Sequence, residues 1–359
     1  MTRPSRVVVD KQALRHNLQR VKQLAPHSRV MAIIKADAYG HGIVRVAETL
    51  SEADAFGVAC LEEAQQLRSA GVSNDIVLLE GPHKAQDLPQ IAELELDIVI
   101  HNAHQVDIIE KTSLAAPLQC WIKIDTGMHR LGFSLQEFPD VLQRLQACKT
   151  VKPTLRLMTH LATANEQQHP LTDKQLDSFS QLCRDIALEK TIANSAAVLS
   201  LPQSHCDWVR PGLMLYGVSP MVDSMASEHG LKPVMTLESE IIAIQHLKAG
   251  EPVGYGATWC CPEDMPVGIV AAGYGDGFPR HARSGTPVLV NDVRCALIGR
   301  ASMDMLTIDL RNQSNARIGD RVVLWGENLP IEEIAQHAGT IPYELLCGVH
   351  KRLSFIERG

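Results

Sequence analysis

Short apolar runs recur between Val30 and Tyr216, each followed by a small or chemically active residue, with amphipathic stretches between them. This alternation is typical of repeated strand–helix units. The stretch Leu61–Ala70 has helical periodicity and is followed by a glycine, as expected of a crossover helix. We count eight candidate strands: Val30–Lys35, Ala55–Ala59, Ile76–Glu80, Asp97–His101, Leu118–Ile124, Leu155–His160, Thr191–Asn194 and Leu213–Gly217. Eight such units predict a TIM-type (β/α)8 barrel.

The pattern changes after residues 221–230, MVDSMASEHG, which have the composition of a linker. Apolar residues then alternate with period two between Gly and Pro turns, in MTLESEIIAI, PVGIVAAGYGDG, TPVLVNDVRCALIG and DRVVLWG. The clear helical segments here are PIEEIAQHAG and the PYELLCG turn. We therefore predict a barrel domain over residues 1–228 and a mainly β C-terminal domain over residues 229–359.

Composition excludes several classes of function. With 359 residues and 45% hydrophobic composition, the chain can bury a substantial core. Its 34 basic residues are scattered and outnumbered by 41 acidic ones, which argues against a nucleic-acid partner. Early charges interrupt any signal-peptide core, and no apolar stretch of about 20 residues occurs, so we expect a soluble cytoplasmic protein without a membrane partner. The nine cysteines have no CxxC spacing and predict free thiols rather than a metal site.

Reactive side chains fall at the predicted strand ends, where barrels carry their catalytic groups. These side chains belong to Lys35, Lys123, His160 and Asn194. Desolvation at the end of a buried strand would leave Lys35 with a nucleophilic amine, as a Schiff-base lysine requires. The alternative is a lysine whose ammonium reaches solvent past an apolar stem.

The segment Ala32–Gly42, AIIKADAYGHG, resembles the cofactor-attachment motif of the alanine racemase family. The similarity continues in order through KIDTGMHRLGF, MTHLA, ANSAA, RPGLMLYG, GYGAT, GYGDGF and IGRASMD, and so covers nearly the whole chain. The resemblance implies a barrel followed by a β domain, with pyridoxal 5′-phosphate bound to Lys35 as a Schiff base.

A phosphate site is expected after the seventh and eighth strands, as in other barrels. Asn194 and Ser195 open a helix there, and Pro-Gly follows Arg210, so that backbone amides and a hydroxyl can converge. The alternative for Asn194 and Ser195 is an ordinary helix cap. The resemblance assigns the phosphate contacts to Tyr39, Ser195, Gly212 and Leu213.

The resemblance also implies how the reaction proceeds. Racemisation needs acid/base groups on both faces of the α-carbon, and these would be Lys35 and Tyr274. Arg210 would face the pyridine nitrogen, and because a guanidinium does not supply a proton, it would restrain side reactions such as transamination. His160 would link Tyr274 to Arg210, although alone it could be a core histidine.

A shared active site follows from the same resemblance. Tyr274, Met303 and Asp304 belong to the β domain and would reach the partner's cavity in a head-to-tail homodimer, where Met303 and Asp304 border the substrate carboxylate. Arg130 would hold the cofactor phenolic oxygen and the substrate carboxylate, for which a guanidinium fork is suited. Lys123 beside it would be carbamylated, which converts it to an anion able to position Arg130.

The chain departs from the commonest family motifs at a few positions. His129 stands where glycine is also usual, and Gly275 stands where alanine is common. Near the C-terminus, LCGVHKRLSF has Arg352, Leu353 and Ser354 in place of Arg-Val-Pro. The changes at His129 and Gly275 do not remove a predicted reactive group, and no phosphate or dimer contact is expected from the C-terminal segment.

The predicted activity is the interconversion of L- and D-alanine, which would supply D-alanine for peptidoglycan or catabolise it. One alternative is a racemase of broader amino-acid specificity. Another is a barrel-type amino-acid decarboxylase, whose family motif has Glu-Pro-Gly where this chain has Arg210, Pro211 and Gly212. A cofactor-carrying protein would resemble the barrel alone, so the additional β domain favours catalysis.

Overall fold

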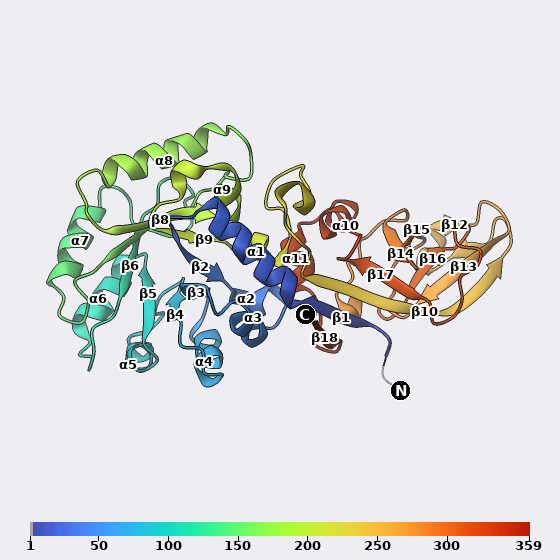
Figure 1. The fold of residues 1–359 in the computed structure, drawn as a ribbon, viewed down its shortest axis with the longest axis horizontal. Coiled ribbons are helices and arrows are strands. Elements are labelled where there is room, and N and C mark those ends of the chain that lie inside the picture. The colour runs from blue at the N-terminus through green and yellow to red at the C-terminus, as the bar shows by residue number, and fades with distance from the viewer. Residues whose placement is uncertain (1–2) are drawn as a thin grey trace.

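The computed structural model describes residues 3–359 as a closed barrel joined to a second sheet (Figure 1). Eight parallel strands follow one another around the barrel in sequence order, which confirms the predicted TIM-type domain. They are β2 (Arg29–Ile33), β3 (Ala55–Val58), β4 (Asp75–Leu78), β5 (Leu96–Ile100), β6 (Cys120–Lys123), β7 (Arg156–Met158), β8 (Glu189–Asn194) and β9 (Trp208–Arg210).

Helices surround the barrel (Figure 1). The predicted helix after Leu61 is α4 (Leu61–Ser69), which buries Ala64 and Leu67. The other barrel helices are α1 (Lys11–Leu24), α2 (Lys35–Tyr39), α3 (Ile43–Thr49), α5 (Leu88–Glu93), α6 (Ala103–Lys111), α7 (Phe138–Ala147), α8 (Pro170–Leu182) and α9 (Ser195–Ser200). No helix within residues 3–359 is long and apolar enough to cross a membrane.

The eighth strand differs from the prediction. The predicted strand Leu213–Gly217 is wrong, because residues Leu213–Tyr216 form the 3-10 helix η3. The barrel is closed instead by β9, in which Trp208 pairs with Arg29 and Val209 with Val30. A short run that is buried on all sides cannot be assigned to strand or helix by periodicity, and a three-residue strand leaves little pattern.

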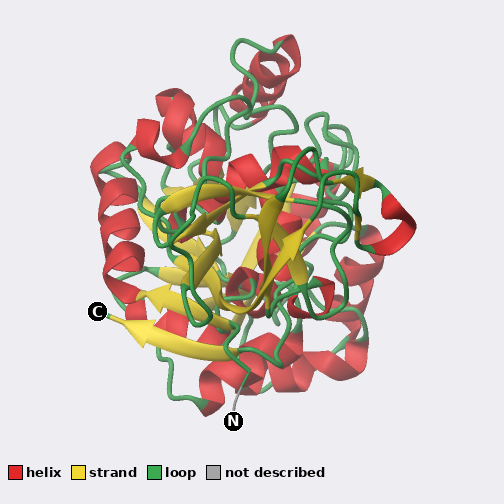
Figure 2. Ribbon diagram, turned by 90° about the vertical axis from the view of Figure 1, so that its right-hand side faces the viewer, coloured by secondary structure: helices red, strands yellow, loops and turns green. Residues whose placement is uncertain are grey.

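The second sheet has eight strands in the order β13-β16-β15-β14-β17-β10-β1-β18. In Figure 2 the end of the molecule that carries this sheet faces the viewer. Apart from β1, these strands are β10 (Met235–Leu247), β13 (Met265–Val270), β14 (Pro287–Val290), β15 (Val293–Leu297), β16 (Leu306–Asp309), β17 (Arg321–Trp325) and β18 (Ser354–Arg358). A separate pair is formed by β11 (Pro252–Val253) and β12 (Trp259–Cys260). The predicted helices are present as α10 (Ile331–Ala338) and α11 (Pro342–Cys347).

The first strand of the chain lies in this second sheet, although the predicted division places residues 1–228 with the barrel. Strand β1 (Arg6–Asp10) pairs antiparallel with β10 and parallel with β18. Its alternating pattern buries Val7 and Val9 completely. Helix α1 then leads into the barrel, and α11 returns from the second part of the chain to contact α2. The two parts are therefore tied together at both chain ends.

Candidate active site

A cavity of about 460 Å³ opens at the carboxyl ends of the barrel strands. Tyr343 and Cys347 of helix α11 complete its wall. The cavity brings together ten of the predicted residues, which are Lys35, Tyr39, Lys123, Arg130, His160, Asn194, Ser195, Arg210, Gly212 and Leu213.

Lys35 begins an unusual backbone turn. The four residues Ala36–Tyr39 all have positive φ, between 52° and 54°, which L-residues rarely adopt in succession. The Glu63 carboxylate accepts the Ala36 amide at 2.6 Å and also that of Ala59, at the end of β3, at 2.8 Å. The lysine is therefore followed by a strained turn that hydrogen bonds hold from the barrel side.

His41 holds the same turn through hydrogen bonds to its backbone. Its Nδ1 lies 3.0 Å from the carbonyl oxygens of both Ala38 and Tyr39, so this nitrogen carries the proton and donates. The ring stacks on Tyr216 at 4.5 Å and is fully buried, and its Nε2 has no partner among residues 3–359. Burial lowers the pKa of His41 to about 4, so the imidazole is neutral at pH 7.

Tyr39 closes one side of the cavity. Its ring packs against Tyr216 at 4.7 Å and Tyr343 at 5.9 Å. Burial raises the pKa of the Tyr39 hydroxyl, which therefore remains a donor. A Cβ on Gly212 would lie 2.6 Å from the Tyr39 oxygen, so only glycine lets the hydroxyl approach the backbone here.

Ser195 lies beside Gly212 and is 4% exposed. Its Oγ accepts the amides of Gly212 at 2.8 Å and Met214 at 3.3 Å. Because none of the described residues accepts the Ser195 proton, that hydroxyl is free to donate. Asn194 instead accepts the amide of Ala197 at 3.1 Å, which is the ordinary helix-cap role that the sequence left open.

Arg210 is buried at the floor of the cavity and bonds to neutral groups. Its guanidinium donates to the Thr191 hydroxyl and the Thr159 carbonyl, both at 2.7 Å, and lies 3.3 Å from His160 Nδ1. Burial lowers the pKa of Arg210 to about 10. Burial and the nearby Arg210 hold the pKa of His160 well below its usual value, so its imidazole is neutral.

Lys123 adds another cation at the end of β6 and is 9% exposed. Burial, followed by the charges of Arg210, Arg130 and Lys35, lowers the pKa of Lys123 to about 8. Within residues 3–359 no carboxylate forms an ion pair with any of these four cations. The cavity is thus positively charged and suited to phosphate and carboxylate groups.

Three predicted residues lie elsewhere in this chain. Tyr274, Met303 and Asp304 belong to loops of the second sheet and do not line the cavity. Tyr274 and Met303 are 39% and 53% exposed, which is high for such large apolar side chains. The guanidinium of Arg280 lies 5.8 Å from the centre of the Tyr274 ring.

Sequence reasoning missed Tyr343 and Cys347 as cavity residues. Their segment, PYELLCG, was identified only as a helical turn. Which face of this helix meets the barrel depends on the packing of α11 on α2, a contact between distant parts of the chain. The one local signal was a tyrosine directly after Pro342 at a helix start, in a chain with five tyrosines.

Comparison with known proteins agrees with this geometry. Residues 9–220 match the alanine racemase N-terminal domain, and residues 234–356 match the alanine racemase C-terminal domain. This chain belongs to the alanine racemase family. Alanine racemases of Nitrosococcus oceani and Coxiella burnetii are 53% and 50% identical to it, over 96% of this chain and 97% and 96% of theirs.

Solved structures of alanine racemases share the whole fold. The biosynthetic alanine racemase of Pseudomonas aeruginosa superposes with a TM-score of 0.97 at 44% identity, covering 100% of both chains. That of Acinetobacter baumannii gives 0.94 at 38% identity, covering 99% of this chain and 100% of the other. The barrel and the second sheet are thus both common to the alanine racemase family.

Proposed function

We propose that this chain interconverts L- and D-alanine, using pyridoxal 5′-phosphate held in the barrel cavity. The observation that carries the proposal is the cluster of Lys35, Lys123, Arg130 and Arg210 without a carboxylate partner among the described residues. Membership of the alanine racemase family supports the same activity.

The cavity residues fit the chemical groups of this cofactor. The hydroxyls of Tyr39 and Ser195 and the backbone at Gly212 and Leu213 form a cradle for a phosphate, and a Cβ at Gly212 would fill it. Arg130 suits the phenolic oxygen, and Arg210 suits the pyridine nitrogen. The ε-amine of Lys35 would join the cofactor covalently.

When bound, pyridoxal phosphate withdraws electrons from the α-carbon of an attached amino acid and so eases loss of its proton. The amine of Lys35 then takes the α-proton on one face or returns it. The hydroxyl of Tyr274, from the partner subunit, does the same on the opposite face. Loss on one face and delivery on the other invert the α-carbon without net gain or loss of a proton.

Arg210 favours racemisation over decarboxylation. Its guanidinium is fixed by Thr159, Thr191 and Ile192, and it donates hydrogen bonds without releasing a proton. Arg210 would therefore leave a pyridine nitrogen held beside it unprotonated, which would weaken the electron withdrawal that the cofactor supplies. A carboxylate at this position, as in the related decarboxylases, would do the reverse.

Lys123 is suited to carbamylation. With its pKa at about 8, part of the amine is neutral near pH 7 and can attack carbon dioxide. The N–C bond forms, the nitrogen releases a proton, and the product carries one negative charge. That charge would pair with Arg130, which forms no ion pair with a carboxylate among the described residues.

We also propose a cytoplasmic homodimer in which Tyr274, Met303 and Asp304 complete the partner's cavity. The exposure of Tyr274 and Met303 in one chain supports this arrangement. Residues 1–228 and 229–359 remain our proposed domains, with β1 as an N-terminal strand added to the second sheet. The likeness to a biosynthetic enzyme supports supply of D-alanine for the cell wall over its breakdown.

The decisive experiment is racemisation of a panel of L-amino acids by the purified protein with added pyridoxal phosphate. We expect alanine to react fastest, although one methylene changes discrimination by only about 1–3 kcal/mol. Release of carbon dioxide without racemisation would favour the decarboxylase. Tight cofactor binding without any turnover would contradict both enzymatic functions.

A further inference from the structure

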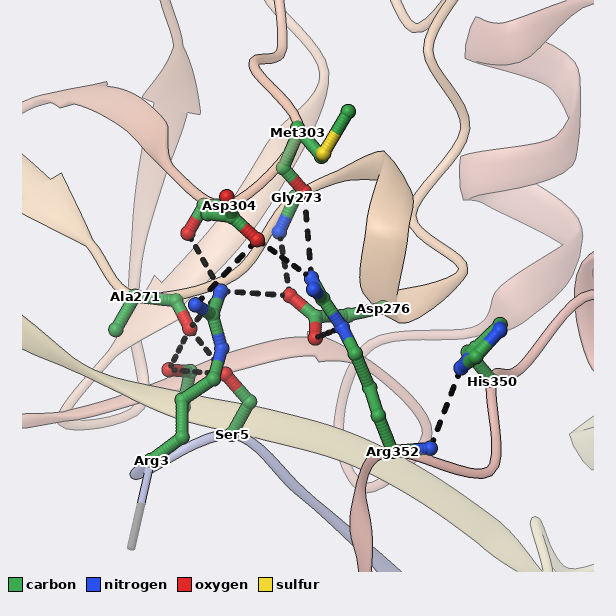
Figure 3. Close-up of polar contacts among 10 residues, drawn as sticks. Arg3, Ser5, Ala271, Gly273, Asp276, Met303, Asp304, His350 and Arg352 are labelled. Carbon is green, nitrogen blue, oxygen red and sulfur yellow. Dashed lines mark hydrogen bonds and ion pairs between the residues drawn. The ribbon is translucent and has the colours of Figure 1, made fainter. Parts of the chain in front are cut away.

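Asp276 is a fully buried carboxylate in the 3-10 helix η6 (Tyr274–Asp276), two residues after Tyr274, and Figure 3 shows its polar contacts. Its Oδ2 accepts Arg3 Nη2 and the amide of Gly273, both at 2.9 Å. Its Oδ1 accepts Arg352 Nε at 2.8 Å. Arg3 comes from the start of the chain and Arg352 from its end, so Asp276 joins three segments that are far apart in sequence.

The same two arginines hold the neighbouring loop. Arg352 Nη2 pairs with the Asp304 carboxylate at 2.8 Å, and Arg3 donates to the Asp304 carbonyl at 2.6 Å. The two loops also bond directly, since the Tyr274 amide donates to Ser302 at 3.0 Å. We call Arg3, Asp276, Asp304 and Arg352 the Asp276 cluster; it ties the Tyr274 loop to the loop of Met303 (Figure 3).

The absence of a side chain at Gly275 leaves space for the guanidinium of Arg352 in the cluster. A Cβ at Gly275 would lie 2.6 Å from Arg352 Nη2 and 3.1 Å from the Met303 carbonyl. The guanidinium of Arg352 thus occupies space that a methyl group on residue 275 would need. Arg352 is therefore packed directly against the backbone that carries Tyr274.

We propose that Asp276 is a positioning residue that fixes Tyr274 and Met303 for proton transfer in the partner's cavity. The inference rests on the proposed function, in which Tyr274 serves one face of the α-carbon. Without the carboxylate, Arg3 and Arg352 lose their common acceptor and the Gly273 amide loses its partner. The two loops can then shift, and a misplacement of about 1 Å lowers a rate by up to roughly 100-fold.

The test uses the holoenzyme and measures exchange of the α-hydrogen in heavy water, separately from L- and D-alanine. Asp276→Asn should slow exchange from one enantiomer by about tenfold to 100-fold more than from the other. Tyr274→Phe should slow the same enantiomer further. Arg352→Gln, at a part-exposed position, should repeat the pattern if Asp276→Asn does not fold, and Arg352→Lys should restore part of the rate.

The matched control is Glu238→Gln. Glu238 is 4% exposed, and its carboxylate also accepts hydrogen bonds from two arginines, Arg6 and Arg321, each at 2.6 Å. It lies on β10, and neither arginine contacts Asp276 or Asp304 through an ion pair. The Glu238→Gln substitution should lower the melting temperature while leaving the ratio of the two exchange rates as it is in the parent. If the asymmetry of Asp276→Asn and Arg352→Gln does not exceed that of Glu238→Gln, the positioning role is wrong. Equal slowing of both enantiomers by Tyr274→Phe would instead overturn the two-base function itself.

Discussion

The barrel cavity and the Asp276 cluster both bury charge, but they balance it in opposite ways. In the cavity, Arg210 donates only to neutral groups, and Lys123 is surrounded by other cations. In the second sheet, Asp276 and Glu238 are each held by two arginines. One region leaves positive charge without an anionic partner, while the other satisfies its charges internally.

This difference separates a binding site from its support. Burying an unpaired charge destabilises a fold, and the cost is offset when a ligand of opposite charge binds. Paired charges hold segments in a fixed geometry without a ligand. The cavity therefore depends on an anion for its full stability, whereas the loops of the second sheet are organised in advance.

The strongest test of the cavity is Lys35→Ala. Because this lysine would be both anchor and base, we expect racemisation to fall by at least about 10⁴-fold. The cation cluster that remains should still bind pyridoxal phosphate reversibly, as equilibrium dialysis would detect. Lys149→Ala, an exposed lysine beyond α7, serves as the control. Normal turnover in the Lys35 variant would show that the chemistry occurs elsewhere.

Arg210→Glu places a carboxylate where the cavity has a buried guanidinium. We expect racemisation to fall by about 100-fold, because the charge facing the cofactor ring is reversed. Absorbance at long wavelength should increase when substrate is added, since the ring becomes a stronger electron acceptor. Arg184→Glu reverses an exposed charge as control. Parental rates and spectra in the Arg210 variant would contradict its proposed role.

Lys123→Met should stabilise the cofactor-free protein at neutral pH. The pKa of Lys123 falls from 10.5 to about 8 on folding, so between these values the unfolded chain binds more protons. The free energy of unfolding therefore rises with pH across that window, as the cost of burying the ammonium is removed. Below pH 8 that cost is present in full, at about 3 kcal/mol.

Urea unfolding of parent and Lys123→Met from pH 7 to 10, without carbon dioxide, measures this difference. The variant's advantage should shrink as pH rises. Added bicarbonate at pH 8 should stabilise the parent alone. An advantage that does not change with pH would show that desolvation of the ammonium is not its cause.

The smallest expected effect is that of His41→Phe. The phenyl ring can keep the stack on Tyr216, but the carbonyls of Ala38 and Tyr39 lose their donor. This loss should lower the free energy of unfolding by about 1–2 kcal/mol near pH 7. The folded pKa of His41, about 4, lies below its usual 6.5, so the parent loses stability as pH falls through this range. Unfolding at pH 7 and 4.5 should show the variant's deficit shrinking, with His27→Phe as an exposed control.

Most of the barrel and its cavity could be predicted because their signals are local. Each strand is a short apolar run, and the ends of parallel strands meet at one face, which brings Lys35, Lys123, His160 and Asn194 together. The prediction of the eighth strand was wrong because the run Leu213–Tyr216 is buried on every side, so its hydrophobic periodicity does not distinguish strand from helix.

The contacts that could not be predicted all join distant segments. RVVVD alternates like a strand, but its partners β10 and β18 are far along the chain. Tyr343 reaches the cavity only because α11 packs on α2. The segment around Arg352 had no expected contact, yet it holds Asp276 and Asp304.

The pairing of β1 with β18 also sets an order for assembly. During synthesis the barrel strands are complete at Arg210, and domains generally begin to fold from the N-terminal side. Strand β1 emerges first but cannot gain its parallel neighbour until Ser354–Arg358 has been made. The sheet that carries Tyr274 is therefore finished only after Ser354–Arg358 has been made, so a chain that stops before Ser354 could form a barrel but would lack β18.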